Sequence, residues 1–412
     1  MSMLRTPSVV QTAQSAASVW TNRNFLILFI TGIIIDFGSK VYELALPLIL
    51  YEWTHSIGTM GTMRAIEFLP NLLFAMFIGV FVDRANKKKW IQMTVIVQTV
   101  LLLGLYLLVE AGFATVYHFY LAGFLLMTLY YAYGNAKVSI IKQVIPTPLL
   151  LTANASFSFV NTLVGLLGPA ISGFILLLSD LHDGLLITAC SFLLAIGTTS
   201  FLQMNVQPAQ ARQTSFWQEL GEGWRILLAI RPLWHITLLV IFLNSTSGMF
   251  DAMVIFYAKD NLQLDNAVLG LLLSITGLGG LAGSSIARYV RQTFATGRLL
   301  GMTIFGSAVA YGTMYLAHSV WVMGIALFLE GLFGTISSLC IWTFRQESTP
   351  PALIGRISGI TGSVFKLGMV FTIFGSGWMA EWFDSSYVFI GAAVFNLLIF
   401  LVYRKMALWQ LQ

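Results

Sequence analysis

The sequence predicts an all-α integral membrane protein with twelve transmembrane helices in two halves of six. Three observations support this prediction. Of the 412 residues, 57% are hydrophobic and only 9% are charged, whereas soluble domains carry about 25% charged residues. Twelve apolar segments are each long enough to cross a bilayer, which takes about 20 residues. Lys and Arg gather on one side of these segments, as they do in cytoplasmic loops.

The first half of the chain holds six of these segments. Residues 1–23 are polar and lack the apolar core of a signal peptide, so we expect them to form a cytoplasmic tail. An N-terminal six-helix half is predicted over 24–204. Its spans are expected at 25–53, 58–82, 89–112, 115–141, 151–178 and 184–204.

A polar interval at 205–232 is predicted to be a cytoplasmic linker. Within it, SFWQELGEGWRILLAIRP places aromatic and Leu residues at helical spacing, which is typical of an amphipathic helix lying at the membrane surface. We expect Pro232 to end this helix. A C-terminal half at 233–403 and a cytoplasmic tail at 404–412 complete the chain. The spans of this half are expected at 233–258, 267–289, 298–317, 319–344, 357–380 and 386–403.

The distribution of Lys and Arg fixes the expected orientation. When the N-terminus is placed inside, the external loops hold only Lys259, and the cytoplasmic segments hold all the other basic residues outside the spans. The positive-inside rule therefore predicts that both termini are cytoplasmic and that the protein is a multi-pass component of the cytoplasmic (inner or plasma) membrane.

The composition also excludes several classes of function. Cys190 and Cys340 lie in apolar segments without metal-ligand spacing, so we expect no disulfide, metal or other cofactor. No nucleotide-binding Gly-rich loop or catalytic triad is found, which argues against an enzyme or an ATP-driven pump. The formal net charge of +5 is attributed to cytoplasmic loops and not to nucleic-acid binding. We expect a monomer in the lipid bilayer.

A weak internal repeat supports the division into two halves. Asp83 and Arg84 follow Gly79 by four and five residues, and Ala287 and Arg288 follow Gly283 at the same offsets in the second half. Two later loops, KQVIPTP and RQESTPP, also correspond. Parallel repeats of six spans, with a substrate site between them near the midplane, are a transporter architecture.

The stretch GVFVDRANKKK resembles the loop 2–3 signature of the major facilitator superfamily, G-x-x-x-D-R/K-x-G-R-K/R. Asn86 stands where that signature has glycine, and Asn also adopts left-handed backbone conformations. The resemblance implies that Asp83 caps or pairs across to the second half in one conformational state, with the basic residues facing the cytoplasm. The motif residues it assigns to gating are Gly79, Asp83, Arg84, Lys87 and Lys88.

A second stretch is similar to span 5 of drug:proton antiporters. It reads LTANAS and then GLLGPAISG, with Gly168 and Pro169 as its central residues. Together with ALP at 45–47 and the linker sequence, it resembles the branch that holds macrolide efflux pumps and enterobactin-type siderophore exporters. The antiporter motif of span 4, R-x-x-Q-G, is absent, and YYAYGNAK with Lys137 stands in its place. The likeness to span 5 predicts that Gly168 and Pro169 are gating residues. Because the span-4 motif is absent, the resemblance does not imply the family's usual route of proton coupling.

Three ionisable residues share one face of the first span. Asp36, Lys40 and Glu43 are separated by four and seven residues, which places them within about 40° on a helix. Charges inside a membrane indicate a functional site. We expect Asp36 and Glu43 to share Lys40 and to face the substrate. The alternative is that Lys40 neutralises both acids in a structural role.

In the fold implied by the resemblance, spans 1, 4, 7 and 10 line the cavity and spans 2, 5, 8 and 11 form the gate. Aligning the halves places Asp251 within a residue of Glu43. Asp251 and Glu330 have no base within a helical turn, so they are the proton-coupling candidates. The alternative for both is a hydrogen bond to a neighbouring helix, for example to Asn244 or to a tyrosine of span 4. Arg64 and Glu67, three residues apart on one turn, are expected to form a gate or structural ion pair and not to bind substrate.

These residues lead to a functional hypothesis. The substrate-cavity candidates are Asp36, Lys40, Tyr42, Glu43, Tyr131, Lys137, Asn244 and Lys366. The sequence predicts a secondary transporter that exports a small organic molecule by alternating access, coupled to protons. A drug-like substrate and a metallophore stay equally open; a zwitterionic or polyanionic metallophore would use Lys40, Lys137 and Lys366 as carboxylate partners. The rival functions are an importer, a lipid or lysolipid flippase on the same fold, or a membrane sensor without transport.

Overall fold

The structure is a computed structural model that describes residues 18–84, 86–146, 149–178, 180–203, 216–349 and 354–410, and within these residues it is built from helices. A short 3₁₀ helix, Val19–Thr21, precedes the first long one. The N-terminal half consists of α1 (Arg23–Thr54), α2 (Ile57–Arg84), α3 (Lys87–Glu110), α4 (Val116–Val144), α5 (Leu150–Leu178) and α6 (Asp183–Ser200).

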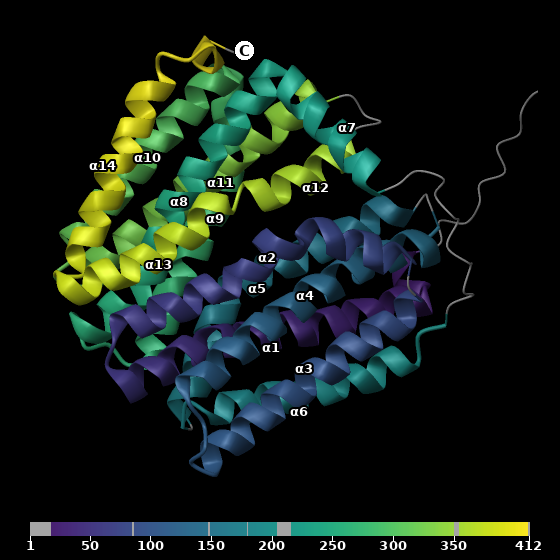
Figure 1. Cartoon of the computed structure of the whole chain (residues 1–412). Coiled ribbons are helices and arrows are strands. Elements are labelled where there is room, and N and C mark those ends of the chain that lie inside the picture. Colours follow the sequence, from purple (N-terminus) through teal and green to yellow (C-terminus); the bar gives the residue numbers. More distant parts are fainter. Residues whose placement is uncertain are drawn as a thin grey trace, which may run out of the picture.

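The linker helix α7 (Phe216–Ala229) leads into the second half. That half consists of α8 (Arg231–Asp260), α9 (Asn266–Thr293), α10 (Thr296–Tyr315), α11 (Val320–Ser348), α12 (Ile354–Val364), α13 (Leu367–Trp382), α14 (Ser386–Tyr403) and the 3₁₀ helix Ala407–Gln410. Figure 1 shows two helix bundles, one purple to blue and one green to yellow, which meet at the lower left and splay toward the upper right.

Nine helical segments of the described chain are long and apolar enough to cross a membrane. They correspond to nine of the twelve predicted spans. The other three predicted spans correspond to α2, α4 and α10. Helices α2 and α4 pack against each other, and α10 packs against α11 and α14. The protein is therefore an all-α, multi-pass membrane protein, as the sequence predicts. The residue boundaries of the halves and of the linker stay predictions.

Local sequence signals account for several helix starts. The side chain of Asn22 accepts a hydrogen bond from the backbone N–H of Phe25 at the start of α1. Asp265 caps α9 in the same way, through the N–H of Val268. A side-chain oxygen at this position satisfies one of the backbone donors that a helix start leaves open.

The span predicted at 357–380 corresponds to the membrane-spanning segment Ile360–Trp382, but it is not one regular helix. The helix is interrupted between α12 and α13, where the N–H of Lys366 bonds to the carbonyl of Ser363 in a tighter turn. Asn244 Nδ2 of α8 donates a hydrogen bond to the carbonyl oxygen of Phe365, over 2.9 Å. A neighbouring helix thus satisfies a backbone group at the break, which allows a helix to be broken inside a membrane.

Pro232 does not end the linker helix, contrary to the sequence prediction. Helix α7 stops at Ala229, and α8 begins at Arg231 with Pro232 in its first turn. Proline is favoured at this position because its missing N–H has no intrahelical partner there, and its fixed φ suits the helix.

The ends of the helices define two sides of the molecule. We call the side with the start of α1 and the end of α14 the terminal side, and the opposite one the distal side. On the distal side the two halves are in contact. Tyr51 Oη of α1 donates to Asp260 Oδ1 of α8 over 2.9 Å. The Glu381 carboxylate of α13 accepts bonds from Ser56 Oγ at 3.0 Å and from the N–H of Gly58 of α2 at 2.8 Å.

Glycines allow the halves to approach closely on this side. A Cβ on Gly61 of α2 would lie 2.7 Å from Cα of Gly377 of α13, and a Cβ on Gly173 of α5 would lie 2.9 Å from Cα of Gly270 of α9. Small residues of this kind bring membrane helices into backbone contact.

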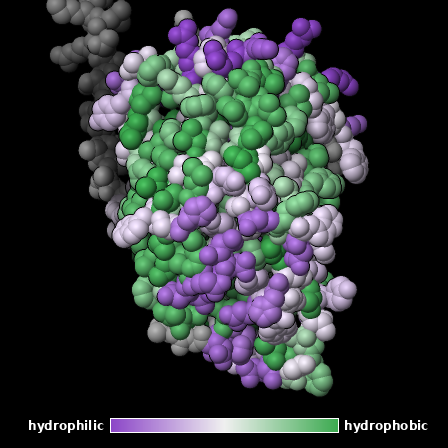
Figure 2. Space-filling model, turned by 90° about the vertical axis from the view of Figure 1, so that its left-hand side faces the viewer, coloured by the Kyte–Doolittle hydropathy of each residue, from purple (hydrophilic) through white to green (hydrophobic). Residues whose placement is uncertain are grey.

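Figure 2 views the molecule from the left of Figure 1 and shows hydrophilic residues gathered over the lower part of that face, with hydrophobic residues around them.

Candidate functional site: a cavity between the two halves

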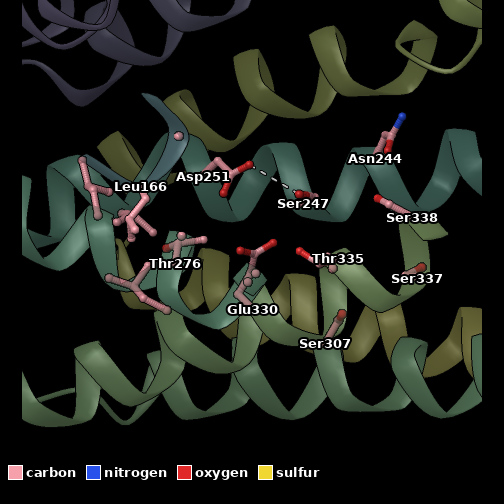
Figure 3. Close-up of a pocket in the computed structure, with 18 of the residues that line it drawn as sticks. Leu166, Asn244, Ser247, Asp251, Thr276, Ser307, Glu330, Thr335, Ser337 and Ser338 are labelled. Carbon is pink, nitrogen blue, oxygen red and sulfur yellow. Dashed lines mark hydrogen bonds between the residues drawn. The ribbon is translucent and has the colours of Figure 1, made fainter. Parts of the chain in front are cut away.

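A cavity of about 790 Å³ lies between the two halves. The N-terminal half contributes residues of α1, α2 and α5, and the C-terminal half contributes residues of α8, α9, α10, α11 and α14. The volume lies within the range of small-molecule binding sites, about 300–1,000 Å³. Figure 3 shows that part of the cavity wall which carries its carboxylates and hydroxyl groups.

Asp251 of α8 and Glu330 of α11 extend into this cavity from two helices of the C-terminal half and face one another (Figure 3). Asp251 is exposed to the cavity, and its Oδ2 accepts a hydrogen bond from Ser247 Oγ at 3.4 Å. In the described part of the chain, neither carboxylate has a basic side chain in ion-pair contact. Asn244 bonds to the Phe365 carbonyl and not to Asp251, so the alternative of an Asn244 partner is wrong for this carboxylate.

The wall around the two carboxylates is rich in hydroxyl groups. Thr276 of α9, Ser307 of α10 and Thr335 of α11 lie beside Glu330, and α11 adds Ser337 and Ser338 (Figure 3). None of these residues was predicted from the sequence. Ser337 follows Glu330 by seven residues, which places it within about 20° on the helix, so a projection of α11 would have revealed it. Thr335 and Ser338, at five and eight residues, lie farther round the helix.

The N-terminal half presents its charges to the cavity as ion pairs. Lys40 Nζ lies 2.6 Å from Glu43 Oε2 on α1, and both residues line the cavity. Arg64 of α2 also lines it and lies 2.9 Å from Glu67, as the spacing predicts. Glu43 and Asp251 line one cavity from opposite halves, in agreement with the alignment of the repeats.

Asp36 does not share Lys40, contrary to the expectation for the first span. Its Oδ2 lies 3.2 Å from Lys137 Nζ of α4, and Tyr130 Oη donates to its Oδ1 at 3.4 Å. The Lys137 ammonium also lies over the ring of Phe157, 5.7 Å from its centroid. Asp36 is 6% exposed. The four-residue offset makes contact with Lys40 possible, but α4 supplies a base that sequence spacing could not reveal.

Other predicted cavity residues lie elsewhere. Tyr42 is fully buried, and Tyr131 and Lys366 are not among the residues that line the cavity. Lys366 stands at the break between α12 and α13, with its ammonium 5.0 Å from the ring centroid of Phe68 of the other half. Whether any of these residues contacts a substrate stays a prediction.

The gating residues are described only in part. A Cβ on Gly168 would lie 2.9 Å from Lys40 Cγ, so this glycine leaves room for the Lys40 stem, and Pro169 lines the cavity. Lys88 Nζ donates to the Leu202 carbonyl at 2.6 Å. For Gly79, Asp83 and Arg84 the structure describes only the backbone, so the motif's contacts stay predictions, as does the role of Lys87.

Comparison with known proteins agrees with this architecture. The family model of the Major Facilitator Superfamily matches residues 28–373 and 247–409. The chain is 25% identical over 344 residues to an enterobactin exporter, EntS, of Escherichia coli O81 (strain ED1a), which covers 82% of this chain and 81% of that protein. The EntS protein of Shigella boydii serotype 18 is similar to the same extent.

Solved structures show the same fold at low sequence identity. The crystal structure of the nucleoside transporter NupG aligns with a TM-score of 0.73 and 13% identity, over 94% of this chain and 100% of that one. A bacterial homologue of the iron transporter ferroportin, in an inward-facing state, aligns with a TM-score of 0.72 and 14% identity, over 93% and 99% of the two chains.

Proposed function

This chain belongs to the Major Facilitator Superfamily, and on that premise we propose that it is a secondary transporter that exports a small organic molecule by alternating access. The cavity of about 790 Å³ between the halves carries the proposal, because it offers a ligand-sized space at the interface that alternating access rearranges. The export direction is supported by the relatives named enterobactin exporters, which match over four fifths of both chains.

The arrangement of the halves supports the same direction. We place the terminal side in the cytoplasm, because the basic residues of the tails and loops gather there. The distal side would then face outward, and its cross-half contacts at Tyr51–Asp260 and Gly58–Glu381 would close the cavity to the exterior. In this state a substrate would enter from the cytoplasm, as export requires.

Proton coupling is proposed for Asp251 and Glu330. Both carboxylates extend into the cavity, and their charges interact. Two like charges that face one another in one cavity favour the uptake of a proton by one of them. Protonation from outside would alternate with the loading of substrate from inside. Drug-like and metallophore-like molecules are both small enough for such a cavity.

Gradient-driven efflux from inside-loaded proteoliposomes tests this function. Asp251→Asn should reduce pH-gradient-driven efflux to background, because asparagine cannot carry the proton, while the protein still reaches the membrane. Glu110→Gln is the matched control: Glu110 pairs with His182 at 2.7 Å outside the cavity. Full pH-driven efflux by the Asp251 variant would remove this residue from the mechanism. Uptake against the proposed direction, or lipid movement without solute efflux, would favour an importer or a flippase.

A further inference from the structure

The charges that face the cavity are distributed unequally between its two walls. The wall of the N-terminal half contributes Lys40, Glu43 and Arg64, and the wall of the C-terminal half contributes Asp251 and Glu330. The N-terminal wall thus carries bases and an acid, and the C-terminal wall carries two acids. Which charges remain for a ligand depends on the ion pairs that these residues already make.

Each base on the N-terminal wall already has a carboxylate partner. Lys40 lies 2.6 Å from Glu43, and Arg64 lies 2.9 Å from Glu67, which is 1% exposed. Removing either base from its pair would leave a poorly solvated carboxylate without a counter-charge, which costs several kcal/mol. Arg64 and Lys40 are therefore poor partners for the anionic group of a ligand.

The C-terminal wall leaves negative charge available. Asp251 accepts one bond from a neutral hydroxyl, Ser247, and in the described part of the chain Glu330 has no hydrogen-bond or ion-pair partner. Arg64 lines the other wall of the cavity, but it is bonded to Glu67. The C-terminal wall therefore carries two carboxylates. Because Glu67 already neutralises the charge of Arg64, Arg64 is not free to neutralise these carboxylates.

The surroundings of the two carboxylates point to a ligand larger than a bare ion. Hydroxyl groups of Ser307, Thr335 and Ser338 line the same wall (Figure 3), and the rings of Tyr311 and Trp342 lie along the cavity. Hydroxyls can accept bonds from or donate bonds to an organic ligand, and aromatic faces attract cations. An organic molecule with a positively charged nitrogen would contact the carboxylates, the hydroxyl groups and the aromatic rings.

From this arrangement we infer that the cavity takes an organic cation, whose charged nitrogen lies between Asp251 and Glu330 while its polar body contacts the hydroxyl wall. The inference rests on the proposed function, since it treats this cavity as the transport site. It favours a drug-like substrate over a metallophore, the two substrate classes that the sequence left open. A polyanionic metallophore would need free bases in the cavity. Lys40 and Lys137 are already paired with Glu43 and Asp36, and Lys366 is not among the residues that line the cavity.

Equilibrium binding to the purified full-length protein, without any gradient, tests the inference. Three fluorescent probes share one xanthene framework and differ in charge: a cationic rhodamine methyl ester, its zwitterionic free acid, and the anionic fluorescein. Fluorescence anisotropy should rank their affinities cation first, zwitterion second and anion last. Asp251→Asn and Glu330→Gln should each weaken binding of the cation about tenfold or more, because each removes one partner of a desolvated charge pair.

Two variants serve as controls for the charge change. Glu110→Gln removes a carboxylate outside the cavity and should leave all three affinities unchanged. Glu330→Asp keeps the charge and should retain more affinity for the cation than Glu330→Gln. If a variant does not fold, the ranking of the three probes on the unmodified protein still decides the matter.

Two results would overturn the inference: fluorescein binding as tightly as the cationic ester, or undiminished cation binding in both the Asp251→Asn and the Glu330→Gln variant. Because the assay contains no gradient, it is independent of transport direction and proton coupling. A protein that binds the cation but shows no efflux would contradict the proposed function and not this inference.

Discussion

At the scale of single residues, each of the three intramembrane bases of the N-terminal half forms an ion pair with a carboxylate. Lys40, Arg64 and Lys137 each lie within 3.2 Å of a carboxylate. A charge in a membrane interior is costly unless it is paired or solvated. Two of these pairs are three residues apart on one helix, and the third joins α1 to α4. The last pair therefore bears on tertiary packing and the other two mainly on local charge.

The Lys137–Asp36 pair should contribute to stability only as a unit. Lys137→Met leaves the Asp36 carboxylate buried without its counter-charge, so we expect a loss of about 3–5 kcal/mol. Thermal unfolding of the purified protein in detergent measures this loss as a fall in Tm. The double variant Asp36→Asn with Lys137→Met should regain much of the Tm, since it buries no unpaired charge.

Arg64→Met with Glu67→Gln provides a matched comparison, because that pair lies on one helix and joins no others. Its double variant should leave the packing of α1 on α4 unchanged. Strictly additive losses of Tm in the Asp36 and Lys137 variants would contradict a coupled pair.

At the scale of helices, close glycine contacts build the seams between the halves. A Cβ on Gly270 of α9 would meet the carbonyl oxygen of Pro169 of α5 at 2.4 Å. Ser274 lies one turn further along the same seam and accepts a bond from the N–H of Ala170 at 3.1 Å. Because backbone atoms line both sides of this contact, a side chain cannot be accommodated by rotating a neighbour.

Gly270→Leu should therefore drive the distal ends apart and favour a state that is open on that side. The readout is the rate at which a membrane-impermeant maleimide labels Ser274→Cys, in a background that carries Cys190→Ser and Cys340→Ser. Labelling should be several-fold faster in the Gly270→Leu variant. Gly104→Leu is the control, since a Cβ there meets nothing within 4 Å. Equal labelling rates in the two variants would show that this seam does not hold the distal side closed.

At the scale of the whole molecule, transport requires the distal contacts to break and re-form. Tyr51 and Asp260 connect α1 and α8 across the halves, at 2.9 Å between their oxygen atoms. If the halves move as rigid bodies, these two positions must separate during each cycle. A covalent link there would hold the cavity closed on the distal side.

We expect a cleavable bifunctional thiol reagent to inhibit the Tyr51→Cys, Asp260→Cys variant of the cysteine-free protein. Efflux from proteoliposomes should stop when the reagent bridges the halves, and reduction should restore it. Each single cysteine variant, treated in the same way, should keep its activity. Transport that continues after complete cross-linking would contradict a rocking motion at this contact.

Much of the architecture could be predicted because the bilayer restricts what a sequence can do. Apolar length predicted the spans, and the spacing of three residues predicted the Arg64–Glu67 pair, since both depend on one helix alone. The repeat also placed Glu43 and Asp251 in one cavity. The break at Lys366 was missed because it depends on Asn244, which is 121 residues away from Phe365.

The sequence by itself determined the fold class, the family resemblance and the set of ionisable groups inside the membrane, because hydropathy and short motifs are local properties of the chain. Only the tertiary structure decided how those groups are paired. In the structure Lys137 of α4 forms an ion pair with Asp36 of α1, and Lys40 forms one with Glu43. Hydroxyl groups line the cavity around Asp251 and Glu330. Such pairing depends on distances between helices that are remote in sequence, and in a medium of low dielectric constant those distances determine which charges remain available to a ligand.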